Sequence, residues 1–167
     1  SIPFAAKVFI GVVLAASNAW AFPNCSALEA QVDSWQMYLL GHGNPALSDA
    51  AGILVYGQTV TNDNDRVLNA RHKTDVSTIF VRNLAGDFVR VATSVPSGVE
   101  GSRQPAVGTT LTHGGLAWTA LNAGNTYCGV VTLFGTSYES VYRPIFNSNG
   151  VVIGALYVGN LPARPRD

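Results

Sequence analysis

Two strand–turn–strand patterns dominate the hydrophobic and polar positions along the chain. In both, β-branched and aromatic residues flank a polar turn that contains glycine. The strand segments are residues 78–82 with 87–94, and residues 137–145 with 151–159. The second turn contains Asn149-Gly150, the dipeptide most typical of a tight hairpin. The pattern therefore predicts two β-hairpins that frame one antiparallel sheet.

A helical pattern precedes the hairpins. Its apolar positions recur at steps of four, three and four residues and are Leu28, Val32, Trp35 and Leu39. Asn24 and Ser26 are favourable N-caps, and Gly41 with Gly43 ends the pattern. We expect an amphipathic helix that packs one face against the sheet.

The other segments are shorter and contain more turn residues. We expect a loop at residues 42–52, then a short strand at 53–56 with 59–60 as its ragged end. A brief helix should follow the turn at 62–65, and a second short helix should lie at 116–123. The remaining segments are a polar loop at 96–105 and a proline-broken tail at 162–167. The oxygen-rich turn at 62–65 favours helix capping over calcium, because Arg66 stands where a further ligand would fall.

The strand segments also carry a resemblance to a known family. Residues 78–82, 88–94, 106–111, 124–129, 133–135 and 142–145 resemble the Cache domain of bacterial chemoreceptors, and more narrowly its Cache 3/Cache 2 fusion variant. The resemblance runs from about Gly52 to Gly159. It implies an α+β, PAS-like fold: a central antiparallel β-sheet, an N-terminal helix on one face, and short helices and loops on the other. It also implies a small bound ligand.

Length and charge narrow the function classes. A chain of 167 residues suits one domain, which we place at residues 22–161. Only 12% of residues are charged, and ten basic side chains balance ten acidic ones. Such a chain has no net positive charge that would attract the phosphate backbone of nucleic acid. Its near-zero net charge also gives little electrostatic resistance to self-association.

The first 21 residues resemble a secretory signal. Lys7 precedes the nine apolar residues 8–16, and Ala19-Trp20-Ala21 matches a cleavage site. We therefore expect export to the periplasm or the extracellular space. Because nine residues are too few to cross a ~30 Å hydrocarbon core, a membrane anchor is the weaker interpretation. A third interpretation is a retained segment packed against a neighbouring molecule.

Cys25 and Cys128 are the two cysteines of the chain. In an oxidising compartment an even number favours a disulfide, and the alternative is a pair of buried thiols. No histidine pair has the spacing of metal ligands, so we expect no metal site and no cofactor.

Catalytic patterns are absent from the sequence. His42, His72 and His113 lie in loop or helix-end contexts without a serine or cysteine nucleophile nearby. We interpret them as solvated histidines and the protein as a non-enzyme.

Arg90 is the strongest candidate for ligand binding. Strand alternation places it on one face with Phe88, Ala92 and Ser94, among apolar neighbours where its charge must be paired or bind an anion. On the later strand, Thr136, Tyr138, Ser140 and Tyr142 share a face. Tyr127, Tyr138 and Tyr142 are the candidate hydroxyl donors around Arg90, which predicts a site for a small carboxylate or similar polar metabolite. Alternatively, Arg90 pairs with Asp87 or Glu139, and Arg143 faces solvent.

Two functions follow. The first is an exported, small-molecule-binding sensor module without its own output domain, which signals through a separate membrane partner. The alternative is a structural subunit of an extracellular filament, or an accessory subunit of an envelope complex, built on the same fold. Self-association in the alternative would use residues 1–21 or the sheet edges.

Overall fold

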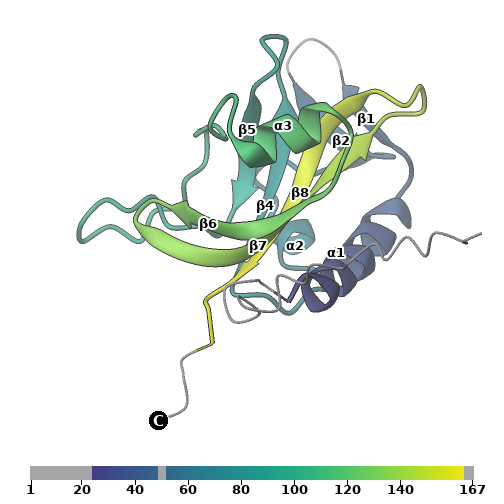
Figure 1. The fold of residues 1–167 in the computed structure, drawn as a ribbon. Coiled ribbons are helices and arrows are strands. Elements are labelled where there is room, and N and C mark those ends of the chain that lie inside the picture. The colour runs from purple at the N-terminus through teal and green to yellow at the C-terminus, as the bar shows by residue number, and fades with distance from the viewer. Residues whose placement is uncertain (1–23, 49–51, 164–167) are drawn as a thin grey trace, which may run out of the picture.

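The computed structural model of the chain describes residues 24–48 and 52–163. The signal-like residues 1–21 and the last four residues of the tail lie outside this part. The centre of the fold is a five-stranded antiparallel sheet of order β5-β4-β8-β7-β6 (Figure 1). Its strands are β4 (Val76–Arg82), β5 (Phe88–Thr93), β6 (Tyr127–Leu133), β7 (Thr136–Phe146) and β8 (Val152–Asn160). Both predicted hairpins, β4 with β5 and β7 with β8, are confirmed.

In the described part of the chain three helices accompany the sheet, and each was predicted. They are α1 (Cys25–Leu40), α2 (Asp65–Leu68) and α3 (Leu116–Asn122). The side chain of Asn24 caps α1 by accepting a hydrogen bond from the Ala27 amide, and Asn64 caps α2. The long helix α1 covers one face of the sheet, and α3 covers the opposite face (Figure 1).

A small second sheet corrects two expectations. It contains β1 (Pro45–Ser48), β2 (Ile53–Tyr56) and β3 (Thr59–Val60) in that order. The predicted loop thus contains a strand that begins at Pro45. The supposed ragged end is a separate strand that turns back at Gly57, whose φ is 60°. This left-handed turn glycine was the sequence signal for the reversal.

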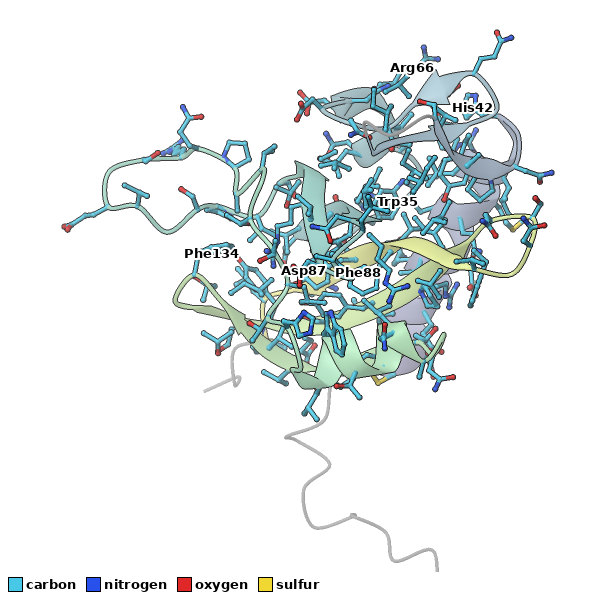
Figure 2. The ribbon with its side chains drawn as sticks, turned by 90° about the horizontal axis from the view of Figure 1, so that it is seen from above. Trp35, His42, Arg66, Asp87, Phe88 and Phe134 are labelled. Carbon is cyan, nitrogen blue, oxygen red and sulfur yellow. A yellow bond between two sulfur atoms is a disulfide. The ribbon has the colours of Figure 1, made fainter. Side chains whose placement is uncertain are left out.

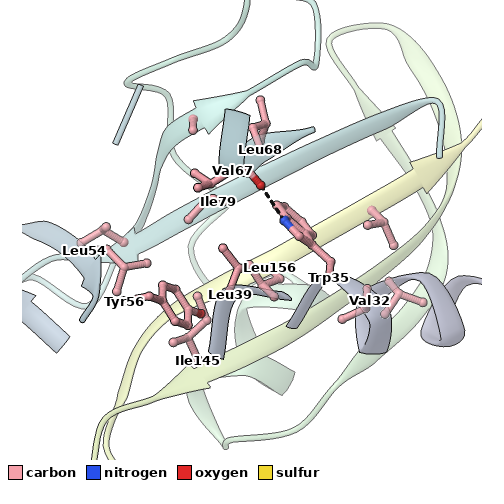
Figure 3. Packing of buried hydrophobic residues seen from close by; sticks show 14 of the residues in the cluster. Val32, Trp35, Leu39, Leu54, Tyr56, Val67, Leu68, Ile79, Ile145 and Leu156 are labelled. Carbon is pink, nitrogen blue, oxygen red and sulfur yellow. Dashed lines mark hydrogen bonds between the residues drawn. The ribbon is translucent and has the colours of Figure 1, made fainter. Parts of the chain in front are cut away.

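The sheet separates two apolar cores. The core under α1 contains Trp35, Leu39, Ile79, Val141 and Leu156 (Figure 3). Within it, the Trp35 indole donates a 2.7 Å hydrogen bond to the Val67 carbonyl, which joins α1 to α2. The core under α3 contains Phe80, Phe88, Leu121, Tyr142 and Tyr157.

A β-bulge in β5 changes which residues face each core. Ile79 pairs with Ala92 but Phe80 pairs with Arg90, so Val91 is an extra residue on β5. Arg90 therefore lies on the α3 side, whereas Ala92 lies in the α1 core. The expectation that Arg90 and Ala92 share a face is wrong, because strict alternation fails across the bulge.

The predicted disulfide is present. Cys25 at the start of α1 is bonded to Cys128 on β6, with the two Cα atoms 6.0 Å apart. The bond fixes the beginning of α1 to the strand at one edge of the sheet.

His72 packs against the α1 core and makes the stability of the fold depend on pH. Its ring packs 4.7 Å from Trp35, and burial lowers its pKa even though a 2.5 Å contact with the Leu68 carbonyl raises it. The unfolded chain then binds a proton at higher pH than the folded chain, so stability falls as pH drops below the ordinary histidine value of ~6.5.

We expect His72→Gln to flatten the loss of stability between about pH 7 and pH 5, as measured by urea unfolding. Because the ring is partly exposed, the effect stays below about 1 kcal/mol. His42→Gln, at an exposed position, is the control. If the free energy of unfolding of His72→Gln depends on pH as that of the wild type does, other groups cause the loss of stability at low pH.

Candidate functional site

Arg90 is buried on the α3 side of the sheet, with 2% of its surface exposed. Its Nη1 donates hydrogen bonds of 3.1 Å to the Thr109 hydroxyl and the Thr110 carbonyl. The guanidinium lies 5.0 Å from the ring centre of Phe80 and 5.3 Å from that of Phe134, the turn residue labelled in Figure 2. Two aromatic rings and two neutral oxygens therefore hold this cation.

Neither acidic partner of the alternative interpretation forms a salt bridge with Arg90. Asp87 lies 2.6 Å from His113 instead, and Glu139 alternates with Tyr138 and so points to the other face of β7. No acidic side chain forms a salt bridge with Arg90 among residues 24–48 and 52–163, and its buried Nε has no hydrogen-bond partner there. Burial accordingly lowers the pKa of Arg90.

The three predicted tyrosines lie on the same side of the sheet as Arg90. Tyr138 and Tyr142 are buried on β7, and Tyr127 on β6 stands opposite Tyr142 with their ring centres 6.2 Å apart. Tyr157 on β8 completes the set: its ring lies 4.6 Å from Tyr142, and its hydroxyl is 3.0 Å from the Ser140 hydroxyl. We call these residues with Arg90 the Arg90–tyrosine cluster.

Sequence reasoning missed Tyr157. Its strand is apolar at nearly every position, so alternation could not separate the two faces. The pairing of β7 with β8, which sets Tyr142 opposite Tyr157, was the information required.

Burial keeps the hydroxyls of Tyr142 and Tyr157 protonated. It is the largest cause of the raised pKa of both Tyr142 and Tyr157, and the Arg90 charge opposes it in each case. These hydroxyls are therefore neutral at physiological pH, and each can donate a hydrogen bond to an anion.

A cavity of about 250 Å³ opens between α3 and β6, and we call it the α3–β6 pocket. Its lining is mostly apolar and includes Leu116, Trp118 and Val130. Tyr127 and Tyr142 also line it and so connect it to the cluster, whereas Arg90 and Tyr138 lie outside its lining. The pocket is small beside the ~300–1,000 Å³ of typical ligand sites, which suits a ligand of few atoms.

His113 and Asp87 form a surface pair beside this pocket. The His113 ring stacks on Trp118 at 4.1 Å, and the Trp118 indole donates a 2.9 Å hydrogen bond to the Gly86 carbonyl. These contacts fix α3 to the β4–β5 turn, where Asp87 and Phe88 are labelled in Figure 2. His113 is thus paired and not simply solvated as expected. We assign it to positioning α3.

Two further expectations concern residues away from the cluster. The alternative interpretation placed Arg143 in solvent, but it lies on the α1 side of the sheet and forms an ion pair with Asp33 and a hydrogen bond with Gln36. In the turn at 62–65, Asn64 caps α2 by accepting a hydrogen bond from the Val67 amide, as predicted, whereas the Asn62 side chain accepts a hydrogen bond from the Leu54 amide of β2. In the described part of the chain, no three metal-ligating side chains come together.

An antiparallel sheet with a long N-terminal helix on one face and a pocket under a short helix on the other defines the PAS-like class of α+β sensor folds. Within this class, the chain belongs to the Cache family. It matches the Cache 3/Cache 2 fusion domain over residues 32–163, which includes most of α1 as well as the sheet. Cache domains are extracytoplasmic sensor domains that bind small molecules.

The comparison with curated proteins finds no match for this chain. Among the helices that the structure describes, none has the length and apolar character needed to span a membrane.

Proposed function

We propose that this protein is an exported Cache sensor domain that binds a small carboxylate at the Arg90–tyrosine cluster. The observation that carries the proposal is the buried Arg90 guanidinium, which has no acidic partner among the described residues and an Nε without a hydrogen bond. A buried cation of this kind is costly unless a counter-charge joins it. A bound carboxylate would supply that charge and accept hydrogen bonds from tyrosine hydroxyls.

The surrounding residues suggest how the ligand enters and lies. Phe134, at the β6–β7 turn, covers the Arg90 guanidinium and is 39% exposed. Displacement of this ring opens a route to the cation, and the α3–β6 pocket then holds the apolar part of the ligand beside Tyr127 and Tyr142. Binding would thereby couple to the position of the β6–β7 turn.

The disulfide suits an oxidising compartment, and the proposal places the domain in the periplasm or outside the cell. Of the two routes to self-association in the filament alternative, residues 1–21 lie outside the described part, and the edge strands β5 and β6 are the other. The observation that favours ligand binding is Arg90, whose Nε has no hydrogen-bond partner among the described residues.

A thermal-shift screen of the oxidised chain against short carboxylates, amino acids, amines and purines tests this proposal. At a hundred times its dissociation constant, a ligand stabilises the folded state by about 2.7 kcal/mol. We expect carboxylates to raise the melting temperature of the wild type, and Arg90→Met to abolish this rise.

Methionine retains much of the apolar bulk of Arg90, so we expect Arg90→Met to stay folded, within about 1.5 kcal/mol of the wild type. Arg143→Met is the matched control, because Arg143 lies on the opposite face and pairs with Asp33. A carboxylate response that survives in Arg90→Met, or silence across the whole panel, would contradict the proposal.

A further inference from the structure

The two edges of the sheet differ. On β5, the segment that follows in the chain covers the edge: the Arg90 amide donates to the Thr109 carbonyl and the Leu111 amide to the Phe88 carbonyl, each at 2.9 Å. On β6, no turn or loop of the described chain forms such main-chain bonds. Within residues 24–48 and 52–163, β6 is therefore an open edge.

The β6–β7 turn determines which main-chain groups of β6 face outward. Phe134 and Gly135 have φ values of 49° and 84°, as in a two-residue type I′ hairpin. In such a hairpin the flanking pair, Leu133 with Thr136, exchanges both hydrogen bonds, and bonded pairs alternate with non-bonded pairs along the strands.

This alternation leaves three residues of β6 with unpaired main-chain groups. Val131 and Gly129 bond to β7, whereas Cys128, Val130 and Thr132 direct their N–H and C=O groups away from it. The outward groups thus recur every second residue, which is the repeat of an extended peptide.

The open edge borders the α3–β6 pocket. Val130 and Thr132 both line this pocket, and Val130 is 47% exposed. β6 contains no charged residue and no proline, the devices that usually prevent another chain from adding to an edge. Opposite the edge, Leu116 at the start of α3 is 75% exposed.

We propose that the ligand is a short peptide-like acid, such as an N-acylated apolar amino acid or a dipeptide, whose amide pairs with the main chain of Val130. This inference rests on the proposed function, because the carboxylate is directed toward Tyr127, the member of the Arg90–tyrosine cluster that lies on β6 and lines the same pocket. The apolar side chain lies against Leu116 and against Val131, whose side chain is on the α3 side of β6. Strand addition of this kind obtains affinity from main-chain hydrogen bonds and specificity from side-chain pockets.

The size of the pocket and the position of α3 favour a short ligand over a second copy of the chain at this edge. The pocket lies between β6 and α3, and α3 is beside β6 in both views (Figures 1 and 2). The β6–β7 hairpin of a second copy would meet α3 there, whereas one or two extended residues fit a cavity of about 250 Å³.

Three matched ligands test the amide, with affinities measured by calorimetry on the oxidised full chain. N-acetylvaline has the acid, the side chain and the amide, and its O-acetyl ester analogue replaces only the amide N–H by oxygen. N-acetylvalinamide retains the amide but lacks the acid. We expect N-acetylvaline to bind about tenfold more tightly than the ester analogue, since one hydrogen bond is lost and an ester oxygen faces a carbonyl.

The outcomes separate the two proposals. Equal binding of N-acetylvaline and its ester analogue overturns strand addition but leaves the carboxylate site intact. Equal binding of N-acetylvaline and its neutral amide overturns the carboxylate site but supports strand addition. Binding of none of the three overturns the peptide-like ligand, while a response to other carboxylates would still support the proposed function.

Amide hydrogen exchange gives a second readout that does not depend on a variant. We expect N-acetylvaline to slow exchange of the Val130 amide by about tenfold or more, and the exchange of the Val131 amide, which already bonds to β7, to change much less.

In Val130→Pro, which removes only an outward N–H, the preference for N-acetylvaline over the simple acid 3-methylbutanoate should disappear. A Val130 amide whose exchange stays unchanged in the saturated complex would exclude pairing at this edge.

Discussion

Loss of the disulfide should lower the free energy of unfolding by about 3–5 kcal/mol. The bond joins Cys25 to Cys128 across 103 positions of the sequence, so it restricts a large loop of the unfolded chain. It also holds the start of α1 against β6, and α1 supplies four buried side chains to the core. The loss is therefore a large share of the ~5–15 kcal/mol that stabilises a typical domain.

Urea unfolding with and without a thiol reductant measures this effect. Cys25→Ser/Cys128→Ser is the matched control, because it should unfold like the reduced wild type and show no response to reductant. If oxidised and reduced wild type unfold at the same urea concentration, the bond contributes nothing to stability. A single-cysteine variant is a poor substitute, since it leaves a free thiol that can form dimers.

The sequence was most informative where local signals and burial agree. The stripe of Leu28, Val32, Trp35 and Leu39 predicts α1, and all four side chains are buried. The hairpin at Asn149-Gly150 is likewise confirmed. In these segments the propensity of each residue and the pattern of apolar positions favour the same structure, so no tertiary contact is needed to choose.

The errors occurred where pairing between distant segments of the chain determines the local structure. The strand at 45–48 depends on its partner β2, and the return at Gly57 depends on the same small sheet. The bulge at Val91 is invisible in the sequence, because its register is fixed by pairing with β4. Arg143 finds Asp33 only after α1 has packed on the sheet.

The candidate site shows the same division. Strand alternation grouped Tyr138 with Tyr142 and Phe88 with Arg90, and the structure places all four on the α3 side of the sheet. Arg90 keeps the face that alternation gives it relative to Phe88, because the bulge begins after it. That bulge also lets β5 place a cation under α3 and then return Ala92 to the α1 core. The irregularity is thus part of how one strand supplies both cores.

Trp35→Ala should destabilise the fold by about 3–5 kcal/mol. The Trp35 side chain is fully buried between α1 and the sheet, and its indole bonds to the Val67 carbonyl (Figure 3). Truncation therefore leaves both a cavity and an unpaired carbonyl. It also removes the ring on which His72 packs, so the α1 core loses contacts on both sides of the tryptophan.

Trp118→Ala is the matched comparison, again by urea unfolding. Its indole also donates to a main-chain carbonyl, that of Gly86, but the ring is only partly buried beside the α3–β6 pocket. We expect a smaller loss of stability there, together with altered ligand binding, whereas Trp35→Ala acts through the fold alone. Equal losses from the two substitutions would mean that α3 supports the sheet as strongly as α1 does. In that case the pocket would lie within a rigid core, and entry of a ligand beside α3 would require unfolding rather than displacement of the Phe134 turn.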